Sequence, residues 1–240
     1  MSEQLNEEKK RLITGLIFAT AFVLLMWIVK LAEITLGTDY SDFGIYPRTL
    51  FGLIGILTTP FLHADLTHLF NNSVPVFLSI IGIFYFFRKY AVDIITFSFL
   101  STGFLIWLFA RDSYIIGASG MAYTWLSFLF FGGLLSHNKN LMALSLIIIF
   151  VYGSLFWGLL PVKNNISWES HLMGAMNGLA FAFLYRKSAF IDPKQVIEEE
   201  DEDEENEEVI ENANPPTPEN ESYWKYTNST GKENESIDYK

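Results

Sequence analysis

The sequence predicts an all-α polytopic membrane protein, in which a bundle of six transmembrane helices precedes a disordered acidic tail. Half of the 240 residues are hydrophobic and the mean hydropathy is +0.26, values outside the range of ordinary soluble domains. Six apolar runs are each close to the length that crosses about 30 Å of hydrocarbon. The charge is segregated as well, because residues 188–240 carry 17 of the 27 acidic residues but only 4 of the 16 basic ones.

The first apolar run, residues 12–29, lies between Lys9-Lys10-Arg11 and Lys30. It is long enough to span a bilayer as a helix. No small-residue cleavage site follows it, so we expect a retained anchor and not a signal peptide. Residues 1–10 then form a polar cytoplasmic segment.

Five further runs complete the expected bundle, at residues 69–87, 94–110, 119–135, 141–160 and 168–185. Lys and Arg residues near the ends of the runs favour a cytoplasmic N-terminus and C-terminus. In that topology eight of them lie on the cytoplasmic side and four on the outer side.

The first outer loop, residues 37–67, begins polar and becomes apolar over residues 50–57. We expect it to lie in the membrane interface, or to dip into the bilayer beside other protein, because bare backbone is not stable in lipid. Asp65 and Asp93 have side chains suited to the N-caps of the second and third helices.

Residues 188–240 differ from the rest of the chain. Ten of the eleven residues from Glu198 to Glu208 are acidic. Such a segment buries too little apolar surface to offset its ordering entropy, so we predict a disordered cytoplasmic tail. The alternative is a docking site for an unknown cytoplasmic partner, for example through residues 223–226.

A few polar residues interrupt the predicted helices, where such groups are costly and often functional. They are His68, Asn71 and Asn72 in the second helix, Ser119 at the start of the fourth, and His171 and Asn177 in the sixth. His68 and Asn72 are four residues apart and share a helix face. In the predicted topology Asn72, Ser119 and His171 lie at one level, roughly 22–26 Å above the cytoplasmic ends of their helices. One assembled site requires such a shared depth.

The fourth and sixth helices carry spacings that fit this site. Ser119 and Tyr123 share a face of the fourth helix. His171, Gly174 and Gly178 form a stripe on the sixth, and small residues let helix backbones approach closely. If the stripe packs on the fourth helix, the His171 imidazole reaches the Ser119 hydroxyl. That pair meets the nucleophile-and-base requirement of covalent catalysis.

Each residue has a simpler interpretation when it is taken alone. A serine at a helix start is more often a cap, and a single histidine is more often a polar packing contact. A metal site at His63 and His68 is disfavoured, because the two are five residues apart across a loop boundary. Asn71 and Asn177 are interpreted as packing or interhelical hydrogen-bonding residues.

Three motifs together resemble the rhomboid intramembrane serine proteases, in their bacterial six-helix form. They are His63-x4-His68-x3-Asn72, Gly117-x-Ser119-Gly120 with Tyr123, and His171-x2-Gly174-x3-Gly178. A lone GxSG is weak, but three motifs in order on the second, fourth and sixth helices are a strong signal. The resemblance covers about Lys9 to Lys187 and implies a bacterial cytoplasmic (inner) membrane protein.

The resemblance implies a catalytic dyad of Ser119 and His171 without a third acid. The oxyanion would be held by the Ser119 backbone N–H and the side chains of His68 and Asn72, with Gly117 in a supporting position. Tyr123 would pack on the His171 ring.

The same resemblance implies structural roles for His63, Gly174 and Gly178. It also implies transmembrane protein substrates within the lipid bilayer, with no cofactor, metal or nucleic acid. The chain departs from the family where Pro47-Arg48 replaces the frequent Trp-Arg of the first outer loop. Phe156 and Trp157 fit either the border of a substrate entrance or an aromatic belt.

Two other functions compete with proteolysis. A catalytically inactive rhomboid-like binder would capture membrane proteins without cutting them, but such relatives characteristically lose the serine or the histidine that this chain keeps. A small transporter would favour inverted repeats and interrupted helices, and the sequence has no internal repeat.

Overall fold

The computed structural model describes residues 2–136, 138–151, 159–160 and 167–188, and this part of the chain is helical. Its α-helices are α1 (Ser2–Leu36), α2 (Gly55–Thr58), α3 (Leu66–Phe86), α4 (Ala91–Phe109), α5 (Ser119–Leu135), α6 (Lys139–Val151) and α8 (Trp168–Tyr185). Four 3-10 helices join them: η1 (Ser41–Phe43), η2 (Phe51–Leu53), η3 (Thr59–Phe61) and η4 (Arg88–Tyr90). No strand occurs among these residues, and the nearest feature is an isolated antiparallel bridge between Ile45 and Ile115.

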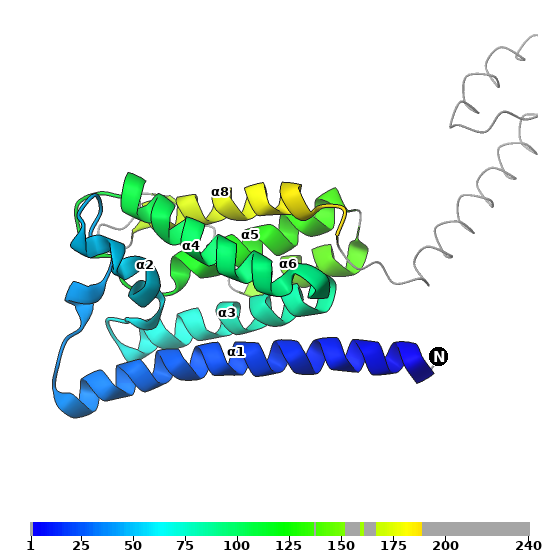
Figure 1. The fold of residues 1–240 in the computed structure, drawn as a ribbon, viewed down its shortest axis with the longest axis horizontal. Coiled ribbons are helices and arrows are strands. Elements are labelled where there is room, and N and C mark those ends of the chain that lie inside the picture. Colours follow the sequence, from blue (N-terminus) through cyan, green and yellow to red (C-terminus); the bar gives the residue numbers. More distant parts are fainter. Residues whose placement is uncertain (1, 137, 152–158, 161–166, 189–240) are drawn as a thin grey trace, which may run out of the picture. The chain divides into compact units, whose positions relative to one another are not determined.

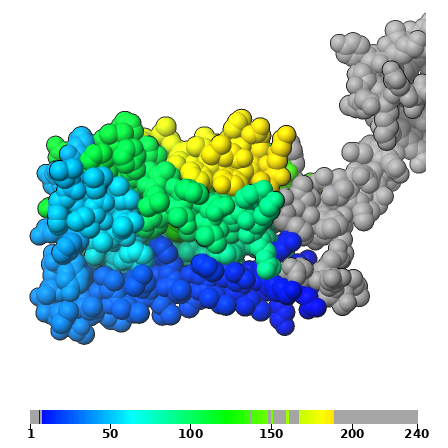
Figure 2. Space-filling model, in the orientation of Figure 1, coloured from blue at the N-terminus to red at the C-terminus, as the bar shows by residue number. Residues whose placement is uncertain are grey.

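The long helices lie side by side, with α5 in the interior. α1 packs along α3, and α5 packs against α3, α6 and α8 (Figure 1). α4 packs against both α5 and α8. In the space-filling view α1 (blue) closes one side of the bundle and α8 (yellow) the other (Figure 2).

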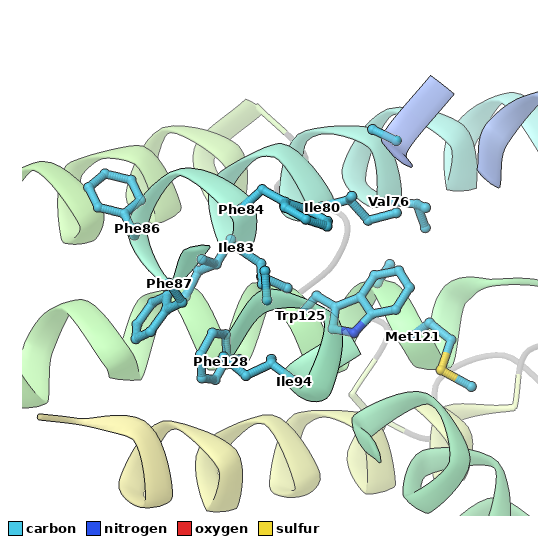
Figure 3. Packing of buried hydrophobic residues seen from close by; sticks show 14 of the residues in the cluster. Val76, Ile80, Ile83, Phe84, Phe86, Phe87, Ile94, Met121, Trp125 and Phe128 are labelled. Carbon is cyan, nitrogen blue, oxygen red and sulfur yellow. The ribbon is translucent and has the colours of Figure 1, made fainter. Parts of the chain in front are cut away.

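Large side chains from α3 and α5 fill the core between these helices. Val76, Ile80 and Ile83 face Trp125 and Phe128 across it (Figure 3). All five side chains are almost fully buried. This packing fixes the position of α5 along the axis of α3. It thereby also fixes where the first residue of α5 lies relative to α3.

Three segments of the described chain are long and apolar enough to cross a membrane, by length and composition. They are Glu8–Leu36, Leu66–Phe86 and Arg88–Phe109. α5 is a shorter apolar helix. The predicted span at 141–160 is described only to Val151 and at 159–160, so much of it, including Phe156 and Trp157, lies outside the described residues. The count of six spans therefore stays a prediction, as does the disordered tail, which also lies outside.

The helix ends agree with the predicted runs to different degrees. α5 and α8 coincide with the predicted 119–135 and 168–185. α1 is longer than its run, because it starts at Ser2 and continues past Lys30 to Leu36.

The two predicted caps have different outcomes. Asp65 is the N-cap of α3, and its Oδ1 accepts the His68 N–H at 2.7 Å, which confirms that prediction. The prediction for Asp93 is wrong, because α4 begins at Ala91 and Tyr90 is its N-cap. Asp93 lies instead in the first helical turn, where a negative charge favours the positive end of the helix dipole.

Asn177 joins α8 to α4, as expected for an interhelical hydrogen-bonding residue. The two hydrogens of its Nδ2 are within reach of three acceptors: the Ser98 carbonyl (3.2 Å), the Ser101 hydroxyl (2.9 Å) and the Thr102 hydroxyl (2.8 Å). The Thr102 hydroxyl in turn bonds the Thr124 hydroxyl of α5 at 2.8 Å. Asn71, by contrast, is exposed and is not a packing residue within the described chain.

The loop between α1 and α3 carries exposed apolar side chains on its short helices. Leu50 is 86% exposed, and Phe51, Ile54 and Leu57 are also exposed. This pattern supports the expectation that the loop lies in the membrane interface.

Candidate active site

Ser119 and His171 lie within hydrogen-bonding distance at the same end of α5 and α8. Ser119 is the first residue of α5, and His171 is in the first turn of α8. The Ser119 Oγ is 2.9 Å from the His171 Nε2. The histidine is only 7% exposed and the serine is half-buried. A hydroxyl and an imidazole in this arrangement can act as nucleophile and base.

Small residues allow the two helices to approach this closely. A Cβ added to Gly174 would lie 2.3 Å from the Gly120 carbonyl oxygen, and one added to Gly178 would lie 2.1 Å from the Thr124 carbonyl oxygen. No side chain fits at these distances. The Ser127 hydroxyl adds a hydrogen bond of 2.7 Å to the Ala175 carbonyl. The predicted stripe on the sixth helix is therefore the surface that packs on α5.

Tyr123 stacks on the ring of His171. The ring centroids are 4.2 Å apart and the planes are inclined by 14°. Tyr123 is itself 7% exposed, so its ring has little freedom to move. The contact holds the plane of the imidazole, and its Nε2 faces Ser119 within that plane.

On the other side of Ser119, Gly117 brings the loop against α3. It has a φ of 106°, which favours glycine. A Cβ at this position would lie 2.7 Å from the His68 Nε2 and 3.2 Å from the Asn72 Nδ2. The two side chains predicted to share a helix face thus both point toward the segment that ends in Ser119.

The amide nitrogen of Asn72 is buried and makes no hydrogen bond with the described residues. The residue is 6% exposed. A buried donor without a partner costs on the order of 1–3 kcal/mol, so such groups call for an explanation. An oxygen atom of a bound molecule would satisfy this donor.

His63 lies outside this group and packs behind His68. Their ring centroids are 5.1 Å apart with an interplanar angle of 69°. Burial, together with the nearby charges of His68 and Lys30, lowers the pKa of His63 to about 3. His63 is thus a neutral packing residue at physiological pH, in line with the structural role that the resemblance implies.

Lys30 and Glu33 hold the turn that contains His63. The Lys30 Nζ donates to the carbonyls of His63 (2.6 Å) and Ala64 (3.0 Å) and pairs with Glu33 at 3.0 Å. Glu33 also accepts the Tyr40 N–H at 2.9 Å. From the sequence, Lys30 is expected only to mark the end of the first span. The pattern in the sequence that could have indicated this role is a Lys and a Glu three residues apart, Lys30 and Glu33, at the end of an apolar run.

Arg48 anchors the first outer loop despite the departure from Trp-Arg. Its guanidinium donates to the Ala110 carbonyl at 2.7 Å and to the Leu108 carbonyl at 3.2 Å, and it pairs with Asp112. The Trp107 Nε1 donates to the Thr49 carbonyl at 2.8 Å in the same region. The loop is therefore fixed to the end of α4.

No group of three or more His, Cys, Asp or Glu side chains that could hold a metal ion occurs within the described part of the chain. His63 and His68, the two histidines considered above as metal ligands, contact each other through their rings.

Comparison with known proteins gives one family match. The family model described as the Rhomboid domain matches residues 51–188. Uncharacterized proteins of Mycobacterium tuberculosis and Mycobacterium bovis are each 30% identical over 191 residues, which cover 74% of this chain and 78% of the relative. An uncharacterized protein of Mycobacterium leprae is 26% identical over 193 residues, with coverage of 75% and 74%.

Proposed function

The chain belongs to the rhomboid family of integral membrane proteins, and we propose on this premise that it is an intramembrane serine endopeptidase. The observation that supports the proposal most directly is the 2.9 Å contact between the Ser119 Oγ and the His171 Nε2. The family supplies the reaction class, and the geometry of the two side chains is suited to it.

In the proposed reaction the Ser119 Oγ attacks the carbonyl carbon of a peptide bond while its proton passes to the His171 Nε2. The tetrahedral intermediate collapses, and the amine leaves with that proton, so an acyl-enzyme remains. Water, deprotonated by His171, then attacks the ester carbonyl and releases the acid product. Ser119 recovers its proton and both residues return to their starting states.

The negative oxygen of the intermediate would lie between α3 and the start of α5. The donors we assign to it are the Ser119 backbone N–H and the side chains of His68 and Asn72. The buried amide nitrogen of Asn72, which has no hydrogen-bond partner among the described residues, supports this assignment, because it is in place before the charge develops. One such donor is worth about 3–4 kcal/mol in other hydrolases.

The proposed substrates are transmembrane segments of other membrane proteins, cut near their outer ends. The domain organisation we propose is a cytoplasmic segment (1–10), a six-helix protease domain (11–187) and an acidic disordered cytoplasmic tail (188–240). Small residues at the cut and a helix that unwinds easily would favour attack, because a helical peptide bond is shielded.

The test is cleavage of a transmembrane model substrate by purified protein in liposomes. We expect wild-type protein to cleave it, and Ser119→Ala and His171→Ala each to abolish cleavage while thermal unfolding stays cooperative. Cleavage that persists in either variant would refute the dyad. A wild-type protein that binds the substrate with micromolar or better affinity but never cuts it would instead identify the inactive binder.

A further inference from the structure

Thr59 joins the first outer loop to the segment that precedes Ser119. It begins η3 and is 3% exposed. Its hydroxyl donates to the Ile115 carbonyl (3.0 Å) and accepts from the Ile45 N–H (2.8 Å). Its own carbonyl accepts the Gly117 N–H at 3.0 Å. The side chain and the backbone of this one residue therefore both engage residues 115–117.

The two chain segments that meet at Thr59 lead to opposite sides of the proposed oxyanion site. One continues from Thr59 into α3, which carries His68 and Asn72. The other runs from Gly117 to Ser119, only two residues further on. Thr59 is covalently continuous with the first segment and hydrogen-bonded to the second. It thus sets the separation between the side-chain donors and the backbone donor.

We infer that Thr59 is a positioning residue for this site, an inference that rests on the proposed function. Its hydroxyl keeps residues 115–117 in register with the loop, so that Gly117 lies against His68. In this register the N–H of Ser119 and the amide of Asn72 would both face the negative oxygen of the proposed intermediate. Neither Ile45 nor Ile115 depends on the hydroxyl alone, because the two also hydrogen-bond each other at 3.0 and 2.9 Å. Loss of the Thr59 hydroxyl therefore changes the alignment of residues 115–117 more than it changes the stability of the fold.

The experiment compares Thr59→Val, which keeps the shape but removes the hydroxyl, with Thr59→Ser, which keeps the hydroxyl. Thr58→Val is the matched control. Thr58 is the neighbouring residue, and its hydroxyl bonds the carbonyls of Phe43 and Ile54 within the loop and not residues 115–117. The readouts are kcat and KM for a transmembrane substrate in liposomes, together with the thermal midpoint of each variant.

We expect Thr59→Val to lower kcat roughly tenfold with KM unchanged, because misaligned donors lose stabilisation of the transition state and not of the bound substrate. Thr59→Ser should stay within about twofold of wild type, and Thr58→Val should keep the wild-type kcat. If kcat instead fell in both valine variants in step with their thermal midpoints, the role of Thr59 would be merely structural. That result would overturn the inference.

The outcomes also separate this inference from the proposed function. If wild type cleaves, Ser119→Ala does not, and Thr59→Val is fully active, then Thr59 is not a positioning residue and the proposed function stands. If wild type is indistinguishable from Ser119→Ala, the proposed function fails and this inference fails with it.

Discussion

Asn72 presents a buried amide nitrogen that makes no hydrogen bond with the described residues and lies beside Gly117. We expect Asn72→Ala to lower kcat by about 10²-fold with little change in KM, because the donor acts on the oxyanion and not on the ground-state substrate. Asn71→Ala is the control, since Asn71 is the exposed neighbour on the same helix. An unchanged kcat in Asn72→Ala would remove this residue from the oxyanion site.

Because of His63, we expect the stability of the folded protein to decrease at acidic pH. Its pKa is about 3 in the folded state and about 6.5 in an unfolded chain. The unfolded state therefore takes up the proton first, and stability falls as the pH drops below about 6.5, by at most about 1.4 kcal/mol per pH unit.

Thermal midpoints between pH 7.5 and pH 5 would check this expectation, because most carboxylates stay ionised in that window. His63→Gln should reduce the dependence, since glutamine does not titrate. A slope equal to that of wild type would show that His63 is not its source.

The site residues that the sequence predicts differ in a physical way from the positions to which the sequence does not point. His68, Asn72 and His171 are polar or ionisable residue types that are rare in membrane helices, and helical spacing shows which faces they share. Serine is common in such helices, and Ser119 stands out by its place in Gly117-x-Ser119-Gly120. Residues such as Lys30 and Thr59 act on backbone groups far away in the chain. Any residue type can present a carbonyl or an N–H, so such contacts leave no pattern in the sequence.

At the scale of elements, the close contact between α5 and α8 determines the distance between Ser119 and His171. We expect Gly174→Val to lower the thermal midpoint by several degrees and to abolish activity, because even a Cβ would lie 2.3 Å from the Gly120 carbonyl oxygen. The check is thermal unfolding together with substrate cleavage. Ala180→Val on the exposed face of α8 is the control, and it should resemble wild type. Wild-type values in Gly174→Val would contradict this packing.

The helices were predictable to different extents for identifiable reasons. α5 and α8 have clear limits, because polar or glycine residues bound both apolar runs. The first helix continues past Lys30 to Leu36, because a lysine ends an apolar run but is a good helix former. The ion pair of Lys30 with Glu33 and its hydrogen bonds to two carbonyls are not visible in a count of apolar residues. The conformation of the first outer loop depends on contacts of Arg48 and Thr59 with residues about 60 positions away.

At the scale of the whole molecule, the residues assigned to the reaction all precede Lys187. We therefore expect deletion of residues 198–240 to leave the rate of model-substrate cleavage unchanged. Initial rates of the truncated and full-length proteins in the same liposomes would test this. A fall of more than about threefold, at equal thermal stability, would instead assign the tail a part in turnover.

The central claim is that His171 activates Ser119 as a nucleophile. Labelling with a fluorophosphonate probe tests it directly, because the probe reacts with activated serines. We expect the wild-type protein to be labelled in a 1:1 ratio at Ser119, and Ser119→Ala and His171→Ala to remain unlabelled although folded. Labelling of His171→Ala at the wild-type rate, or a folded wild-type protein that both resists the probe and fails to cleave, would contradict the account.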